Sequence, residues 1–226
     1  MNVSAASILR RLRRKPERRE APSPLDRIPV VSLRELIQGR PIIRVDGTYN
    51  YCDGSLPWCD IVPLLSLLVD RKPRAVLEVG TFNGHTTRLM ALNLPEATIH
   101  TVDLPETFDG GFEKDDFHLI AARNVGIEHR SDASIGNVRQ HFGDTASWDF
   151  STANATFFFI DGSHTYDYVR NDTERALAAS RGRRATLLWH DCNIMHPDVT
   201  AWLIEMIQSG QPVRRIDESN LAILET

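Results

Sequence analysis

The stretch ATFFFIDGSHTYDYV, residues 155–169, decides the fold of this 226-residue chain. Residues 156–160 are all apolar or β-branched, and the polar run Asp-Gly-Ser-His follows at residues 161–164 before a helical pattern begins. A short apolar segment that ends abruptly in polar residues is typical of a buried strand in a parallel sheet, where ligands bind beyond the carboxyl ends of the strands. We therefore expect a strand here, with functional side chains directly after it.

The same alternation of strand and helix continues on both sides of this stretch. Strands are predicted at residues 75–79, 97–103, 127–132, 156–161 and 185–191. Helical patterns are predicted at residues 85–94, 119–126, 134–142, 166–180 and 197–210. Two last apolar runs, at residues 212–217 and 221–225, have the spacing of a hairpin. This order predicts an α/β fold with a parallel sheet covered on both faces and an antiparallel strand at one edge.

The composition sets broad limits on function. Hydrophobic residues make up 42% of the chain and charged residues 25%, and the formal net charge is −4, so bulk charge does not favour nucleic-acid binding. Three cysteines without a Cys-x-x-Cys spacing argue against a disulfide scaffold or a structural zinc site. No apolar run approaches the roughly 20 residues that span a bilayer. We expect a cytoplasmic protein.

Three regions are expected along the chain. Residues 1–26 contain the basic run RRLRRKPERRE and read as a disordered tail; the alternative is a short amphipathic turn in weak contact with a membrane surface. Residues 27–74 are expected to form helices, at 30–41 and 61–72, and a loop that together cap the ligand-binding cleft. These apolar helices could also pack against a second copy of the chain. Residues 75–226 form the main domain.

A glycine-containing turn follows the first predicted strand, in LEVGTFNGHTT at residues 77–87. Gly80 and Gly84 allow a tight turn and a close approach to a ligand, and Thr86 or Thr87 could satisfy amides at the start of the helix. The pattern is neither a dinucleotide fingerprint nor a Walker A loop, and by itself it also fits a plain strand-to-helix turn.

Two acidic residues suggest what the turn binds. Asp103 ends the next strand, where a carboxylate can accept hydrogen bonds from ribose hydroxyls. Glu78 lies beside the glycines, where its charge would repel a pyrophosphate but would suit a ligand with a cationic amino-acid portion. On charge grounds this favours S-adenosylmethionine over NAD. Asp132 is predicted to end the third strand, where it could bind the adenine amino group.

The segments LEVGTFNGHTTRLMA, TVD, FIDGSHTYDYVRNDTERAL and LLWHDC resemble the class I S-adenosylmethionine-dependent methyltransferases. The resemblance extends over about residues 55–226. It is strongest to the small-molecule O-methyltransferase branch that includes macrocin-type enzymes and cephalosporin-hydroxylase-like proteins. It implies a Rossmann-like, doubly wound sheet of seven strands, mostly parallel, with an antiparallel strand in the C-terminal hairpin. The expected donor-binding residues are Glu78, Gly80, Thr81, Phe82, Gly84, Thr86, Asp103, Asp132, Ala133 and Asp161.

The fourth and fifth strand ends form a candidate metal site. Asp161 follows one strand and the pair His190–Asp191 follows the next, and neighbouring strands lie only about 5 Å apart. Carboxylates suit Mg²⁺, and the histidine would shift the preference toward Mn²⁺ or Fe²⁺. In metal-dependent relatives, as the resemblance implies, these positions hold an ion that orients the acceptor hydroxyl. The alternatives are helix capping by the two acids and a supporting role for His190.

The catalytic base is less well defined. Ser163 occupies a position where relatives often carry an acid, and serine is a poor base without a partner. His164 has a suitable intrinsic pKa, so we expect it, with Asp161, to act in catalysis, either as the base or beside the acceptor. The alternative is that His164 caps the following helix.

These features predict an S-adenosylmethionine-dependent O-methyltransferase that acts on a hydroxyl of a small molecule, such as a sugar, a polyketide or a similar secondary metabolite, with help from a divalent ion. Two alternatives remain open from the sequence. The His190–Asp191 pair also fits a metal-dependent hydroxylase-like protein on the same fold, and Ser163 also fits a donor-binding module without catalysis.

Overall fold

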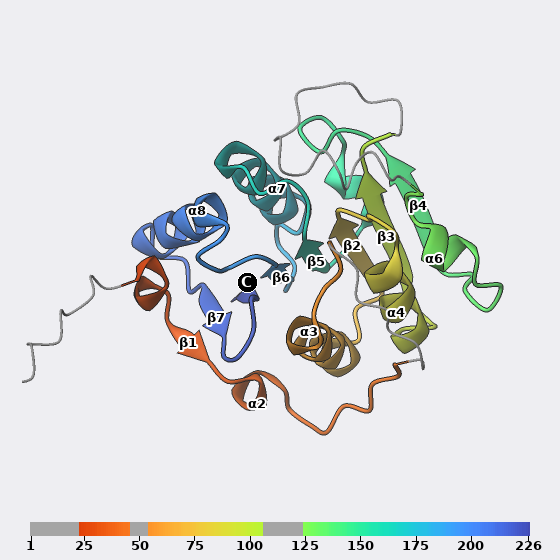
Figure 1. Ribbon diagram of the computed structural model, residues 1–226, viewed down its shortest axis with the longest axis horizontal. Coiled ribbons are helices and arrows are strands. Elements are labelled where there is room, and N and C mark those ends of the chain that lie inside the picture. Colours follow the sequence, from red (N-terminus) through yellow and green to blue (C-terminus); the bar gives the residue numbers. More distant parts are fainter. Residues whose placement is uncertain (1–22, 46–53, 106–123) are drawn as a thin grey trace, which may run out of the picture.

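The computed structural model describes residues 23–45, 54–105 and 124–226. Of the tail predicted at residues 1–26, residues 1–22 lie outside these ranges, and Pro24–Arg27 form a 3-10 turn. The described residues form one eight-stranded sheet with the order β1-β7-β8-β6-β5-β2-β3-β4 (Figure 1). The strands are β1 (Val30–Val31), β2 (Ala75–Val79), β3 (Thr98–Asp103), β4 (Val138–Phe142), β5 (Phe157–Ile160), β6 (Thr186–Trp189), β7 (Arg214–Ile216) and β8 (Ala222–Glu225).

The sheet confirms a mostly parallel α/β fold with an antiparallel hairpin. Strand β8 pairs antiparallel with both β6 and β7, and every other pairing is parallel. The expected number of seven strands is wrong, because Val30 and Val31 pair in parallel with Arg215 and Ile216 and add an eighth strand at the edge. The sequence predicted a helix at these two residues, which directly precede the short helix α2 (Leu33–Leu36).

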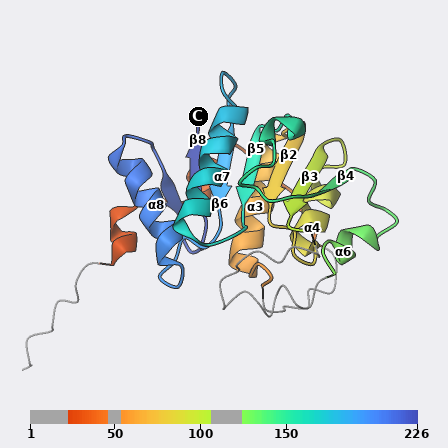
Figure 2. The same ribbon diagram turned by 90° about the horizontal axis from the view of Figure 1, so that it is seen from above.

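Helices cover both faces of the sheet. Helices α7 (Tyr166–Ala179) and α8 (Pro197–Gln208) lie on one face, and α3 (Trp58–Arg71) and α4 (His85–Asn93) lie on the other (Figures 1 and 2). Each face has its own hydrophobic core. The apolar run of β5 serves both, because Phe158 and Ile160 belong to the α7–α8 core, whereas Phe157 and Phe159 belong to the α3–α4 core. This two-sided burial explains why the strand shows no polar residue.

The structure has no strand where the third one was predicted, at residues 127–132. Residues 127–130 form a single helical turn, α6 (Ile127–Arg130), and the strand is β4, at residues predicted to be helical. Gly126 starts the turn with a φ of 72°, a left-handed conformation that glycine adopts readily. Strand β4 is the edge of the sheet and is only partly buried, so its sequence VRQHF lacks the apolar run of a central strand.

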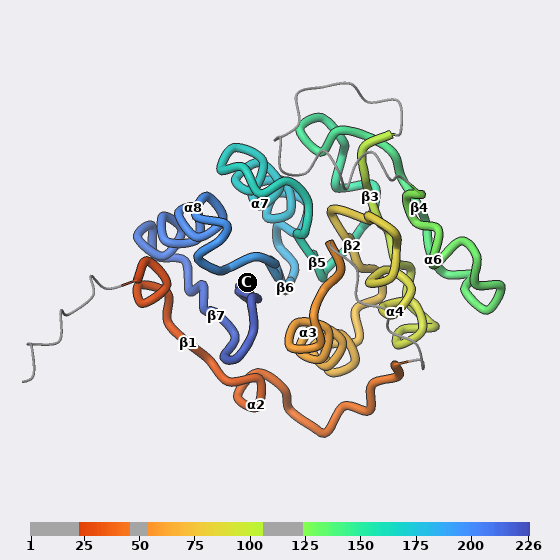
Figure 3. The backbone as a smooth tube through the Cα atoms, viewed as in Figure 1, coloured from red at the N-terminus to blue at the C-terminus, as the bar shows by residue number. Residues whose placement is uncertain are grey.

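The segment at residues 27–74 supplies parts of the sheet and the core. After β1 and α2 the segment runs beside α3 toward α4 (Figure 3). There the amide of Arg44 donates a hydrogen bond to the Asn93 side chain at 2.6 Å, and the same side chain donates one to the Arg44 carbonyl at 2.8 Å. The apolar face of α3 is buried against α4 and the sheet. Two 3-10 turns complete the described structure, η2 (Pro24–Arg27) and η3 (Phe150–Ala153). None of the described helices is both long and apolar enough to cross a membrane.

Candidate active site

The glycine turn after β2 is packed too closely for any other residue. Gly80 has a φ of 91°, and a Cβ on this residue would lie 2.0 Å from the carbonyl oxygen of Asp161. Gly84 has a φ of 82°, and its Cβ would lie 2.7 Å from the Cα of Gly126. Both positions therefore require glycine for conformation and for space. The turn after β2 rests directly on the turn after β5.

Asp103, at the end of β3, organises this turn. Its Oδ2 accepts hydrogen bonds from the amides of Thr81 and Phe82 at 3.0 and 2.9 Å, and its Oδ1 accepts one from the amide of Leu104 at 2.7 Å. The bond to Phe82 holds that residue in the left-handed region, with a φ of 48°. These three bonds fix the Asp103 carboxylate against the turn, at the strand end where a carboxylate can bind ribose hydroxyls.

Glu78 lies inside the sheet rather than on its edge. The side chain is buried, and the hydroxyl of Thr87 donates a hydrogen bond to it. Burial raises the pKa of Glu78 to about 8, so this carboxyl holds its proton more strongly than an ordinary glutamate does. Gly84 is the N-cap residue of α4, and the amide of His85 donates a hydrogen bond to the side chain of Asn83 at 2.9 Å, so the amide partner is neither Thr86 nor Thr87. Thr87 instead joins the helix to β2.

Asp132 and Ala133 do not lie at the carboxyl end of a strand. They precede β4, so the prediction that they end the third strand is wrong. The Asp132 carboxylate accepts hydrogen bonds from the hydroxyl and amide of Ser134 and pairs with Arg88 at 2.7 Å. These bonds lower the pKa of Asp132 to about 2. Asp144 is the acid that lies near the carboxyl end of β4, two residues after Phe142. It accepts a hydrogen bond from the hydroxyl of Tyr168.

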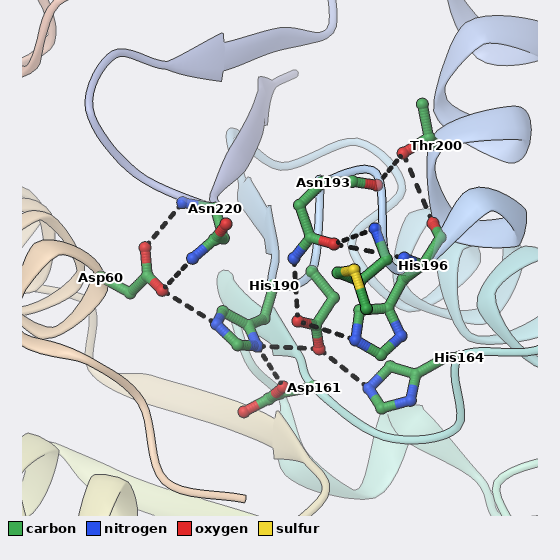
Figure 4. A network of polar contacts seen from close by, with 10 residues as sticks. Asp60, Asp161, His164, His190, Asn193, His196, Thr200 and Asn220 are labelled. Carbon is green, nitrogen blue, oxygen red and sulfur yellow. Dashed lines mark hydrogen bonds and ion pairs between the residues drawn. The ribbon is translucent and has the colours of Figure 1, made fainter. Parts of the chain in front are cut away.

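His190, which follows β6, is the centre of a polar network (Figure 4). Its Nδ1 lies 2.9 Å from Oδ1 of Asp161 and 2.9 Å from Oδ2 of Asp191. Its Nε2 lies 3.0 Å from Oδ2 of Asp60. The structure thus brings together the three residues predicted to hold a metal. Although burial lowers the pKa of His190, the Asp161 carboxylate and the other acids raise it well above its usual value.

Asp60 is a site residue that the sequence analysis missed. It lies in the first turn of α3 and is fully buried. The amide and the side chain of Asn220 donate hydrogen bonds to its two oxygens at 2.7 and 3.0 Å, so the β7–β8 turn fixes it in place. A carboxylate in an otherwise apolar, buried helix is rare without a partner, and that signal could have identified it.

Two more histidines surround Asp191. His164 Nε2 lies 2.8 Å from Oδ2 of Asp191, and His196 Nε2 lies 3.5 Å from Oδ1. The two imidazole rings are 4.0 Å apart, centre to centre. Burial would raise the pKa of Asp191, but hydrogen bonds from His164 and His190 hold it well below its usual value. His196 was missed by the sequence analysis, because a histidine before a proline gives no distinctive pattern.

The capping alternatives do not fit the structure. The N-cap residues of helices α7 and α8 are Thr165 and His196, so none of Asp161, His164 and Asp191 occupies an N-cap position. The hydroxyl of Ser163 contacts that of Thr165 at 3.1 Å, and a second hydroxyl does not activate a serine as a base would.

The donor atoms of Asp161, His190 and Asp191 suit a divalent ion. All three lie within 4.8 Å of one another. Two ligand atoms that bind one ion at right angles, with bonds of about 2.1 Å, lie about 3 Å from each other. The distances from His190 Nδ1 to the oxygens of Asp161 and Asp191, 2.9 Å each, are close to this separation. Asp60 on the opposite nitrogen completes the carboxylate–histidine arrangement that orients a metal-binding imidazole. The residues present therefore fit such an ion.

Comparisons with known proteins identify the family and the fold. The sequence matches the methyltransferase domain family over residues 77–192. A methyltransferase of Podospora anserina, solved with S-adenosylhomocysteine, is 13% identical, with a TM-score of 0.54 over 76% of this chain and 80% of its own. An O-methyltransferase of Bacillus cereus, solved with the same product, is 14% identical, with a TM-score of 0.52 over 77% and 83%. The O-methyltransferase NovP is 13% identical, with a TM-score of 0.51 over 74% and 77%.

No curated protein matches the sequence. At these identities the solved structures establish the fold, and the family match establishes the kinship because it extends over 116 of the 226 residues, 77 to 192 inclusive. The chain belongs to the methyltransferase domain family.

Proposed function

We propose that this protein transfers the methyl group of S-adenosylmethionine to a hydroxyl group of a small molecule, in the cytoplasm, with the help of a divalent ion. The observation that supports this most directly is the packing of Gly80 on the carbonyl oxygen of Asp161. It puts the turn expected to hold the donor against a residue expected to hold the ion. The similar folds of proteins described as O-methyltransferases support the choice of oxygen as the acceptor.

The donor is proposed to bind along the turn after β2 and the end of β3. Asp103 would accept hydrogen bonds from the ribose hydroxyls while it keeps its bonds to the amides of Thr81 and Phe82. Gly80 and Gly84 let the backbone come close to the donor. Thr86 remains a predicted donor contact, whereas Glu78 supports the turn from within the sheet.

The ion is proposed to bind to Asp161, His190 and Asp191, as Mg²⁺, Mn²⁺ or Fe²⁺. When bound, it would polarise the acceptor hydroxyl and lower its pKa. The residues of the chain position the reactants: the glycine turn holds the sulfonium, and Asp161 and His164 lie beside the acceptor. In the transfer the carbon–sulfur bond breaks, a carbon–oxygen bond forms, S-adenosylhomocysteine leaves, and the hydroxyl proton passes to water.

Donor binding and metal dependence can be tested separately. Isothermal titration with S-adenosylmethionine, with and without Mg²⁺ or Mn²⁺, measures the first. Release of S-adenosylhomocysteine in the presence of a panel of hydroxylated small molecules measures turnover. We expect Asp103→Asn to weaken donor binding by about 10- to 100-fold, the loss of one or two charge-assisted hydrogen bonds. We expect Asp161→Asn to keep donor binding within a few-fold and to lose the response of turnover to added metal.

Asp217→Asn is the matched control, because Asp217 is exposed and lies outside the site. It should match the wild type in both assays. Absence of donor binding at millimolar concentrations would contradict the donor assignment. Full metal-stimulated turnover by Asp161→Asn would contradict the metal assignment and leave the donor assignment standing.

A further inference from the structure

We propose that His164, Asp191 and His196 form a second cation site, which takes a first-row transition ion such as Zn²⁺ or Fe²⁺. The three side chains each offer a ligand atom, and these atoms lie within 4.8 Å of one another. Two imidazoles and one carboxylate are a donor set that suits Zn²⁺, Fe²⁺ and related ions, whereas Mg²⁺ prefers oxygen ligands. This site shares Asp191 with the ion site proposed above, but it does not require bound S-adenosylmethionine.

The geometry supports this use of the two histidines. Both present Nε2 to the same carboxylate, His164 to Oδ2 at 2.8 Å and His196 to Oδ1 at 3.5 Å (Figure 4). Their rings are tilted by 43° with centres 4.0 Å apart, so the two imidazoles lie side by side next to this carboxylate. The side chains are 23% and 31% exposed, so an ion held by them would keep positions open for water or substrate, as catalytic metal sites do.

The backbone around the site is built to hold these groups. Asp191 has a φ of 57°, a left-handed conformation that non-glycine residues adopt uncommonly. Such outliers persist where the surrounding structure requires them and are frequent at functional sites. Asn193 accepts hydrogen bonds from the amides of Met195 and His196 at 2.9 and 3.2 Å, and Thr200 donates to the Asn193 carbonyl at 3.0 Å. The loop that carries His196 is therefore fixed from two sides.

The charge balance also calls for cations. Asp60, Asp161 and Asp191 bring three carboxylates to one network. In the part of the chain that the structure describes, their ion-pair partners are histidines, with no lysine or arginine among them. A single divalent ion at Asp161, His190 and Asp191 leaves one negative charge when the imidazoles are neutral. A second divalent ion on the two outer histidines offsets that charge and leaves a net charge of +1.

The test is the number of ions bound per chain. After dialysis against micromolar Zn²⁺ and separately Mg²⁺, the metal content of the protein is measured by elemental analysis. We expect the wild type to hold two equivalents of Zn²⁺ but at most one of Mg²⁺. His196→Asn and His164→Asn should each lose one equivalent of Zn²⁺ and leave Mg²⁺ unchanged. Asparagine is a favoured N-cap residue, so His196→Asn keeps the start of α8.

Two further variants make the result specific. His141→Asn removes a part-buried histidine of β4, outside both sites, and should keep two equivalents of Zn²⁺. His196→Asp replaces one metal ligand with another and should restore the second equivalent. Equal Zn²⁺ content in the wild type, His164→Asn and His196→Asn would overturn the proposal. If His164→Asn then lost turnover at unchanged metal content, His164 would be a general base instead. Titration with S-adenosylmethionine on the same samples reports the donor site independently.

Discussion

The Nε2 atom of His190 lies 3.0 Å from Oδ2 of Asp60, a residue 130 positions earlier in the chain. This contact joins the first turn of α3 to the end of β6. Asp60 also holds the β7–β8 turn through Asn220. One buried carboxylate therefore connects three segments and fixes which nitrogen of His190 faces Asp161 and Asp191.

Replacement of Asp60 with asparagine should weaken both the fold and the ion site. Asparagine can keep some bonds to Asn220 but loses the charge that holds His190. We expect the free energy of unfolding in urea to fall by about 1–3 kcal/mol. We expect the affinity for Mn²⁺, measured by isothermal titration, to fall by about 10- to 100-fold. Asp217→Asn is the exposed control and should change neither value. An unchanged metal affinity would show that Asp60 does not orient His190.

The contact between Gly80 and Asp161 predicts a strong effect of one methyl group. Gly80→Ala places a Cβ 2.0 Å from a backbone oxygen that cannot move without moving Asp161. Gly182→Ala is the matched control, because Gly182 also has a positive φ, 78°, but no atom lies within 4 Å of the position that its Cβ would take. The control should cost about 1–2 kcal/mol for its conformation alone. Gly80→Ala should cost about 1–3 kcal/mol more, from steric overlap.

The measurement is urea unfolding of both variants, followed by titration with S-adenosylmethionine. Donor binding should be lost in Gly80→Ala and unchanged in Gly182→Ala. Equal destabilisation of the two variants would mean that the turn relaxes away from Asp161, and the proposed coupling of the donor turn to the ion site would then fail.

The central strands could be predicted because both of their faces are buried. Strand β2 has the bounds that the sequence predicts, and β5 shows an unbroken apolar run for the same reason. Strand β4 could not be predicted in this way, because it lies at the sheet edge and alternates partly buried and exposed residues. Strand β1 has only two residues and is defined by its pairing with β7, which no local pattern reveals.

Only some residues of the candidate site could be predicted from the sequence, for similar reasons. Asp161, His190 and Asp191 follow predicted strands, so their proximity could be inferred from the geometry of a parallel sheet. Asp60 and His196 come from helix starts, and only tertiary packing brings them to His190 and Asp191. A single sequence carries no record of contacts over such distances.

The raised pKa of Glu78 makes stability depend on pH in a predictable direction. Burial raises the pKa from an ordinary value of 4.5 to about 8, so the folded protein keeps a proton that the unfolded chain releases. Between these pH values the free energy of unfolding must therefore fall as pH rises, by at most about 1.4 kcal/mol per pH unit. Glu78→Gln keeps a neutral group that can accept the Thr87 hydrogen bond, and it does not titrate.

We therefore expect Glu78→Gln to gain stability relative to the wild type as pH rises from 5 to 8, and the difference to level off above pH 8. Urea unfolding of both proteins at four or five pH values measures this difference, in which the titration of all other groups cancels. Thr87→Val should destabilise the protein at every pH without producing this slope, because it removes the hydrogen bond and leaves the carboxyl in place. Parallel stability curves for Glu78→Gln and the wild type would mean that Glu78 ionises normally in the folded protein, and the carboxylate would then be available as an anion beside the donor.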